Sequence, residues 1–291
     1  MRDNFDSFRT TIGRSLPTPV TRRLLRRSDW QRTEGTAAIP WIWPWLVTSI
    51  NQVRFGSSIP EPGSLIWIDP STVQWLLVPR YLVPATNGTY VYGGNWDRSY
   101  SDASIHFKGS SEGFTWPTLI NLQNYTFFQS LKNHFHEGVD WSETELYRAF
   151  STQDLSLQYN GTDGLLNRLT EIDQLYESIA MNGYQTQREL LEESNVPRQN
   201  SINTTNPSRS EVMVNIGRDG EIIFCTGRHR FIIARLLELP TIPVRVHVRH
   251  SRWQERRQRA IAGTTTISHN LVNHPDFADV IESDELDAES V

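Results

Sequence analysis

Two arginines flank a histidine at the point where an apolar strand is expected to give way to an apolar helix. Arg228, His229 and Arg230 follow Gly227 in the segment EIIFCTGRHRFIIARLLELP. The first turn of a helix has backbone N–H groups without intrahelical partners and carries a partial positive charge, so it favours a bound anion. Glycine lets the backbone approach a ligand closely, and arginine can hold a phosphate with two parallel hydrogen bonds. The junction therefore predicts a phosphate site; the alternative is a solvated helix start whose arginines pair with surface acids.

A second candidate group lies in the sequence GGNWD at residues 93–97. Gly94 permits a tight turn, Trp96 could form the wall of a pocket, and Asp97 is suited to act as a general base or as a ligand of a metal ion. The alternative is a glycine turn in which Asp97 only caps the loop. We keep both interpretations, and the functional one makes Asp97 a catalytic and metal-binding residue.

The composition excludes several classes of site. Cys225 is the single cysteine, so an internal disulfide and a multi-cysteine zinc site are impossible. Its place on an apolar strand predicts a small buried residue rather than a nucleophile. The net charge of −5 argues against a protein that binds nucleic acid through its overall field. His134 and His136 would lie about 200° apart on a helix, so they could not chelate one ion.

The pattern of apolar residues predicts an α+β fold. Strands are expected within residues 65–78 and near 90–92, and helices at 124–135 and 165–182. Residues 212–225 read as a hairpin around Asp219-Gly220, and residues 231–239 as a buried helix. In the last strand Val244, Val246 and Val248 alternate with three polar residues, which predicts one covered face and one solvated face. The polar residues are Arg245, His247 and Arg249.

The order of these features resembles the ParB/sulfiredoxin-like superfamily. The matching segments are YESIAMNGY at 176–184 and IGRDGEIIFCTGRHRFIIARLLELPTIPVRV at 216–246. The resemblance implies a mixed sheet with packed helices, and it implies that Gly227, Arg228, His229 and Arg230 contact nucleotide phosphates. Sulfiredoxins place their reactive cysteine directly before the histidine, where this chain has Arg228. ParB proteins continue into a helix-turn-helix DNA reader, whereas only about forty polar residues follow here.

Three regions are predicted along the chain. Residues 1–60 form a basic arm and a Trp/Pro-rich docking segment, 61–250 form the ParB/sulfiredoxin-like domain with a polar insertion at 194–210, and 251–291 form a polar, acidic tail that ends in disorder. The arm has four clustered arginines and is interpreted as mobile, with attachment to a membrane surface or polyanion as the alternative. These are Arg22, Arg23, Arg26 and Arg27. No export signal is recognised, so a cytoplasmic location is expected.

Together these features predict a nucleotide-binding protein, with a nucleoside triphosphate or diphosphate and Mg²⁺ as cofactors. In the leading hypothesis it transfers a phosphoryl group to a small hydroxylated acceptor. Gly227, Arg228 and Arg230 would hold the phosphates, with Gly94 and Trp96 beside the nucleotide. His229 would orient or protonate, and Asp97 would activate the acceptor or hold the metal. The alternative hypothesis is a non-catalytic, nucleotide-responsive regulator or adaptor that binds nucleic acid or a protein partner, without sequence-specific DNA binding.

Overall fold

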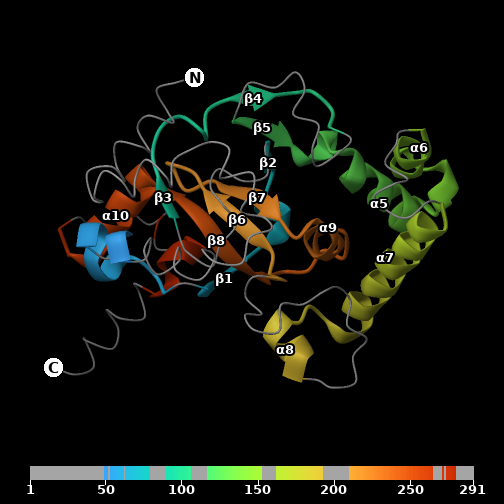
Figure 1. The fold of residues 1–291 in the computed structure, drawn as a ribbon. Helices are drawn as coiled ribbons and strands as arrows, with labels where there is room; N and C mark the ends of the chain where they lie inside the picture. Colours follow the sequence, from blue (N-terminus) through green and yellow to red (C-terminus); the bar gives the residue numbers. More distant parts are fainter. Residues whose placement is uncertain are drawn as a thin grey trace, which may run out of the picture.

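The computed structural model describes most of the chain beyond residue 48. The described residues are 49–78 except 52 and 62, 90–105, 117–152, 162–192, 210–264, and 271–279 except 272. The predicted arginine cluster and most of the insertion at 194–210 lie outside these ranges. Figure 1 shows a central sheet, with α5, α6, α7 and α9 on one side of the view and α10 on the other.

Within the described residues the sheet has eight strands and is mixed, which confirms the predicted combination of a mixed sheet with packed helices. Its order is β1-β8-β6-β7-β2-β5-β4, and β3 also pairs with β8. The strands are β1 (Leu65–Ile68), β2 (Trp75–Val78), β3 (Tyr90–Tyr92), β4 (Tyr100–Ser101), β5 (Thr118–Asn121), β6 (Met213–Ile216), β7 (Ile222–Thr226) and β8 (Ile242–His250). β1, β3 and β6 all pair with β8, so this strand, the longest among the described residues, joins three others next to one edge of the sheet.

The β6–β7 hairpin and the helix that follows it have the form predicted from the sequence. β6 pairs antiparallel with β7, and α9 (Arg228–Leu236) begins directly after β7. The helix therefore starts three residues earlier than the apolar pattern alone predicts, because its first turn is the polar Arg-His-Arg sequence. Its apolar residues Phe231, Ile232 and Ile233 are fully buried.

Three further helices complete the side of the core on which α9 lies. They are α5 (Thr126–Glu137), α6 (Glu145–Thr152) and α7 (Thr162–Asn182), and α9 contacts both α5 and α7. Leu165, Leu169 and Ile172 of α7 join the same hydrophobic core as Val214 and Val244 of the sheet. The 3.6-residue periodicity of this segment correctly predicted its buried face. The short α8 (Gln187–Glu192) follows, and no helix among the described residues is long and apolar enough to span a membrane.

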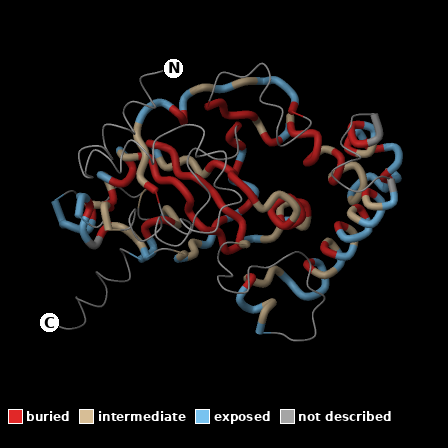
Figure 2. The backbone as a smooth tube through the Cα atoms, viewed as in Figure 1, coloured by how far each residue is buried: buried red, intermediate tan, exposed pale blue. Residues whose placement is uncertain are grey.

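The prediction that one face of the last strand is exposed to solvent is wrong. All nine residues of β8 are buried, as Figure 2 shows for the central strands. Arg245 and Arg249 are only 2% and 1% exposed, and the ring of His247 packs edge-on against Tyr90. Alternation of polar and apolar residues indicates a solvated face only when nothing covers it, and here a later segment supplies a partner for Arg249.

This partner comes from the region predicted to be an acidic tail. α10 (Ser251–Ile261) continues directly from β8, and the 3₁₀ turn η7 (Pro275–Phe277) places Asp276 against Arg249. Asp276 also accepts a hydrogen bond from the Trp253 indole at 2.8 Å. Burial alone would raise the pKa of Asp276, but Arg249 and Arg257 hold it below its usual value. Part of the acidic region therefore belongs to the folded core, whereas residues 280–291 lie outside the described residues.

Two aspartates on this segment allow a matched test. Asp276→Ala leaves Arg249 buried without its carboxylate, so we expect the free energy of unfolding to fall by about 3–5 kcal/mol. The side chain of Asp279 is 54% exposed and its partner Arg257 is buried but also lies 3.9 Å from Asp276, so Asp279→Ala should cost less, about 1–3 kcal/mol. Urea denaturation measures both values, and equal small losses would show that η7 does not belong to the core.

Candidate anion-binding site

The junction between β7 and α9 has a helix start without a side-chain cap. Gly227 is the N-cap of α9 and has a left-handed backbone with φ of 90°, and no side chain caps the helix. An added Cβ would lie 2.9 Å from the Val212 Cα, so the position has no room for a larger residue. The first hydrogen bond of α9 runs from the Phe231 N–H to the Gly227 carbonyl. The backbone N–H groups of the first helical turn, before Phe231, therefore have no hydrogen-bond acceptor within the helix.

The side chain of Arg230 points into the protein and not toward the uncapped start of α9. Its Nη1 donates to the Glu211 carboxylate at 3.1 Å, and its Nη2 donates to the Gln185 carbonyl. The guanidinium carbon also lies 4.2 Å from the centre of the Tyr184 ring. Burial raises the pKa of Glu211, against the opposing attraction of Arg230. Arg230 thus has internal partners, a role different from the phosphate contact that the sequence predicted.

Arg228 and His229 remain half-buried at the start of α9, and both lie beside Phe127 of α5. The guanidinium carbon of Arg228 is 4.5 Å from the centre of the Phe127 ring. The imidazole of His229 meets the same ring edge-on at 5.1 Å. An aromatic ring can support a guanidinium while leaving its N–H groups available to an anion. Of the two predicted phosphate arginines, only Arg228 keeps a position suited to that role.

The structure places a third cationic or titratable side chain beside Arg228 and His229, and the sequence analysis did not predict it. Arg168 of α7 places its Nη2 3.3 Å from Nδ1 of His229, and it also pairs with Glu171 one turn along the same helix. The sequence shows Arg168 only as a polar residue on an amphipathic helix, so nothing in its local pattern distinguishes it. Packing of α7 against α9 brings Arg168, Arg228 and His229 together, with the exposed Glu171 beside them.

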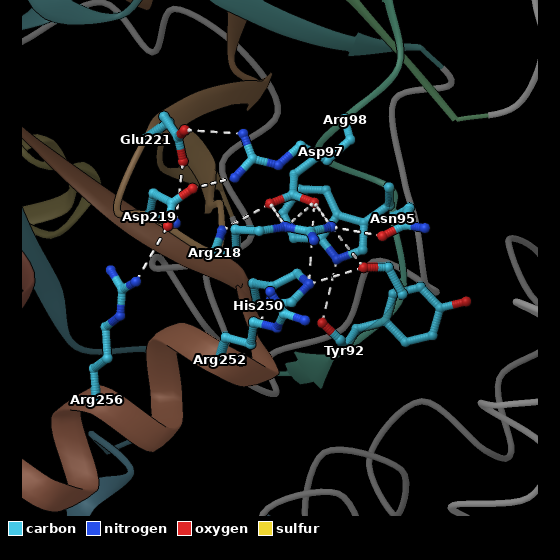
Figure 3. Close-up of polar contacts among 12 residues, drawn as sticks. Tyr92, Asn95, Asp97, Arg98, Arg218, Asp219, Glu221, His250, Arg252 and Arg256 are labelled. Carbon is cyan, nitrogen blue, oxygen red and sulfur yellow. Dashed lines mark hydrogen bonds and ion pairs between the residues drawn. The ribbon is translucent and has the colours of Figure 1, made fainter.

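The second predicted group forms a buried ion pair instead of an open site. Asp97 accepts hydrogen bonds from the backbone N–H of Arg218 at 2.8 Å and from its side-chain Nη2 at 2.6 Å, as Figure 3 shows. Their side chains are 1% and 11% exposed, respectively. Burial would raise the pKa of Asp97, but the hydrogen bonds from Arg218 lower it overall. Asp97 is therefore a stable anion whose two oxygens are occupied, which is poorly suited to a general base.

Gly94 and Trp96 also serve this buried cluster. The Gly94 carbonyl accepts from Arg218 Nη2 at 2.9 Å and from His250 Nε2 at 3.0 Å. Trp96 is 1% exposed, and its indole N–H donates to the Tyr92 carbonyl. Arg218 was not a predicted site residue, because an Arg-Asp-Gly sequence in a hairpin is typical of a solvated turn.

The two predicted groups lie at opposite ends of the β6–β7 hairpin. Arg218 follows β6 in the turn, whereas Gly227 and Arg228 follow β7 at the open end. Five residues of β7 separate the ends, which corresponds to about 17 Å of strand. Asp97 therefore does not face a ligand held at Arg228, and the two groups do not form one catalytic site.

The described carboxylate, histidine and cysteine side chains do not form a metal site. Asp97, the predicted magnesium ligand, already accepts hydrogen bonds from Arg218 through both oxygens. Across the part of the chain that the structure describes, no three His, Cys, Asp or Glu residues gather as a metal site would require. Cys225 is a buried thiol outside any disulfide, as its apolar strand predicted. Comparison with protein-family models, curated proteins and solved structures gives no match for this chain.

Two neighbouring arginines test whether the Asp97 cluster stabilises the fold. Arg218→Met leaves the Asp97 carboxylate buried without its partner, so unfolding should become about 3–5 kcal/mol easier. Arg98 pairs with Asp219 at the surface, and Arg98→Met should change stability by less than about 1 kcal/mol. Chemical denaturation of the two variants provides the comparison. If Arg218→Met left the free energy of unfolding unchanged, the Asp97 carboxylate would not depend on this pair and would be available for other chemistry.

Proposed function

We propose that this protein binds a phosphate-bearing ligand of the nucleotide class at the start of α9. The observation that carries the proposal is the convergence of Arg228, His229 and Arg168 on a helix start that no side chain caps. Arg228 and His229 lie against Phe127 and Arg168 of α7 contacts His229, so the three groups are positioned before a ligand arrives.

The electrostatics of the junction favour an anion. Arg228 and Arg168 lie near the positive end of α9, and the carboxylate that pairs with Arg168 is Glu171, whose side chain is 58% exposed. A phosphate could accept from the amides of the first turn and from Arg228, while Arg168 exchanges part of its contact with Glu171 for the ligand. Such charge-assisted hydrogen bonds contribute about 1.5–3 kcal/mol each when they are shielded from water.

The geometry supports a binding role better than phosphoryl transfer. The only carboxylate assigned to activate an acceptor was Asp97, which is engaged with Arg218 at the other end of the hairpin. Glu211, the buried carboxylate near α9, accepts from Arg230 and from the Gln187 N–H. We therefore favour a nucleotide-responsive binding protein over an enzyme, and we assign no step to a magnesium ion.

The order of elements supports a relationship with the ParB/sulfiredoxin-like superfamily. The hairpin, the left-handed Gly227, the apolar α9 and the valine-rich β8 follow one another as the resemblance implies. In our proposal, Gly227, Arg228 and His229 keep the phosphate-binding role of that junction. Arg230 instead supports the site by fixing α9 to the segment that carries Tyr184 and Gln185.

Removal of the outward arginine should weaken ligand binding selectively. For Arg228→Gln we expect the dissociation constant for ATP, ADP or pyrophosphate to rise about 10- to 100-fold, because one charge-assisted contact is lost. Isothermal titration calorimetry at low salt gives the affinities directly. The unfolding free energy should change by less than about 1 kcal/mol, since Arg228 has no ion-pair partner among the described residues.

Arg148→Gln on α6 is the matched control, because it removes the same charge from an exposed position elsewhere. This variant should bind like the wild type. If Arg228→Gln and Arg148→Gln bind all three ligands equally well, or if the wild type binds none of them, the proposed site is wrong.

A further inference from the structure

Two histidines near the end of the chain occupy the same kind of position. His250 is the N-cap of α10, and His274 is the N-cap of η7. In each case the ring Nδ1 accepts a hydrogen bond from the backbone N–H two residues later. The distance is 3.1 Å both for the Arg252 N–H and for the Asp276 N–H. Each imidazole thus replaces the Ser, Thr or Asp that usually caps a helical turn.

The opposite nitrogen of each ring binds a glycine carbonyl from a distant loop. His250 Nε2 lies 3.0 Å from the Gly94 oxygen, and His274 Nε2 lies 2.9 Å from the Gly220 oxygen. A carbonyl can only accept, so Nε2 must carry the proton while Nδ1 stays unprotonated. Both rings are therefore neutral, and each connects the C-terminal segment to a loop at the turn end of the β6–β7 hairpin.

The surroundings of His250 contain charges of both signs. The Asp97 Oδ1 lies 4.0 Å from Nε2, Arg218 and Arg252 are also close, and the Trp96 ring lies at 5.9 Å. Burial lowers the pKa of His250 below its usual value, and the two arginines act in the same direction. The Gly94 hydrogen bond and Asp97 oppose this shift without cancelling it.

His274 also lies near charges of both signs, which come from other residues. Asp276 favours a proton on the ring, whereas Arg249 and Arg257 oppose it. The ring centre lies 4.5 Å from that of Trp253, and burial lowers the pKa of His274 below its usual value. His274 is only partly buried, so protons can reach it more readily than they reach His250.

We propose that His250 and His274 form a proton-sensitive clamp that holds α10 and η7 on the Gly94 and Gly220 loops. A proton added to Nδ1 uses the lone pair that accepts the Arg252 or Asp276 N–H, so the cap is lost and two N–H groups then face each other. Loss of both caps loosens α10 and η7, which releases Asp276 from Arg249 and exposes Trp253.

The direction of the pH effect follows from the lowered pKa values. Above the unfolded-state pKa of about 6.5 both rings are neutral in either state, and the clamp is fully formed. As the pH falls from there toward the folded-state values, the unfolded chain binds protons that the folded chain resists, so the clamp weakens. Acidification below about pH 6.5 therefore favours the open segment.

Hydrogen exchange measured by mass spectrometry at pH 7.5 and pH 5.5 tests the clamp. After correction for the intrinsic effect of pH, the opening constant of peptides that cover α10 and η7 should rise at least about 10-fold at the lower pH, with little change in α7. The double variant His250→Asn/His274→Asn keeps a capping oxygen that does not titrate, so its opening should not depend on pH. His136→Asn, on α5, is the control and should respond like the wild type.

An NMR titration of the wild type gives a second, independent result. Both imidazoles should show the Nε2–H tautomer at pH 7.5 and should titrate below 6.5. The single variant His274→Asn, at the less buried position, serves if the double variant does not fold, and it should reduce the pH response. The proposal is wrong if either ring titrates above 6.5, or if the Asn variants open with acid as the wild type does.

Discussion

Ion pairs between buried arginines and buried carboxylates decide how distant parts of this chain come together. Arg218 pairs with Asp97, Arg230 with Glu211 and Arg249 with Asp276, and in each pair both side chains are largely removed from solvent. Removing one partner from such a pair costs several kcal/mol, so the members must come together even when they are far apart in sequence. Asp97 and Arg218 are 121 residues apart.

The same constraint determines which cationic groups are left for a ligand. The two arginines of the Arg-His-Arg sequence at 228–230 cannot be distinguished by their local sequence. Arg230, however, donates hydrogen bonds to the Glu211 carboxylate and the Gln185 carbonyl. Arg228 stays beside Phe127 at the helix start, where α7 contributes Arg168 as a replacement for the arginine that turned inward. The turn end of the hairpin uses Arg218 to fix Asp97 and the Gly94 loop. In our proposal one end of the hairpin binds an anion, while the Asp97–Arg218 pair at the other end stabilises the fold.

Local patterns in the sequence predicted the elements well and their partners poorly. The periodicity of α7, the Asp219-Gly220 turn and the apolar α9 gave correct elements, because these depend on residues close together in the chain. The burial of β8 depends on β1 and β3 along one edge and on Asp276 from η7. Nothing near Arg249 in the sequence shows that a carboxylate 27 residues later will cover it. Arg168 and Arg218 were not predicted for the same reason, because their partners are distant in the sequence. Without its partner Arg218, Asp97 had the features of a catalytic base.

The central claim is that a phosphate ligand is held at the start of α9 and not at Asp97. Backbone amide shifts in a ¹H–¹⁵N NMR titration with ATP, and separately with inorganic phosphate, test this claim most directly. We predict that the amides of Gly227, Arg228 and His229 shift with a common saturation curve while those of Gly94, Asp97 and Arg218 remain in place. Shifts confined to the Asp97 loop, or no saturable shift at the start of α9, would contradict the account.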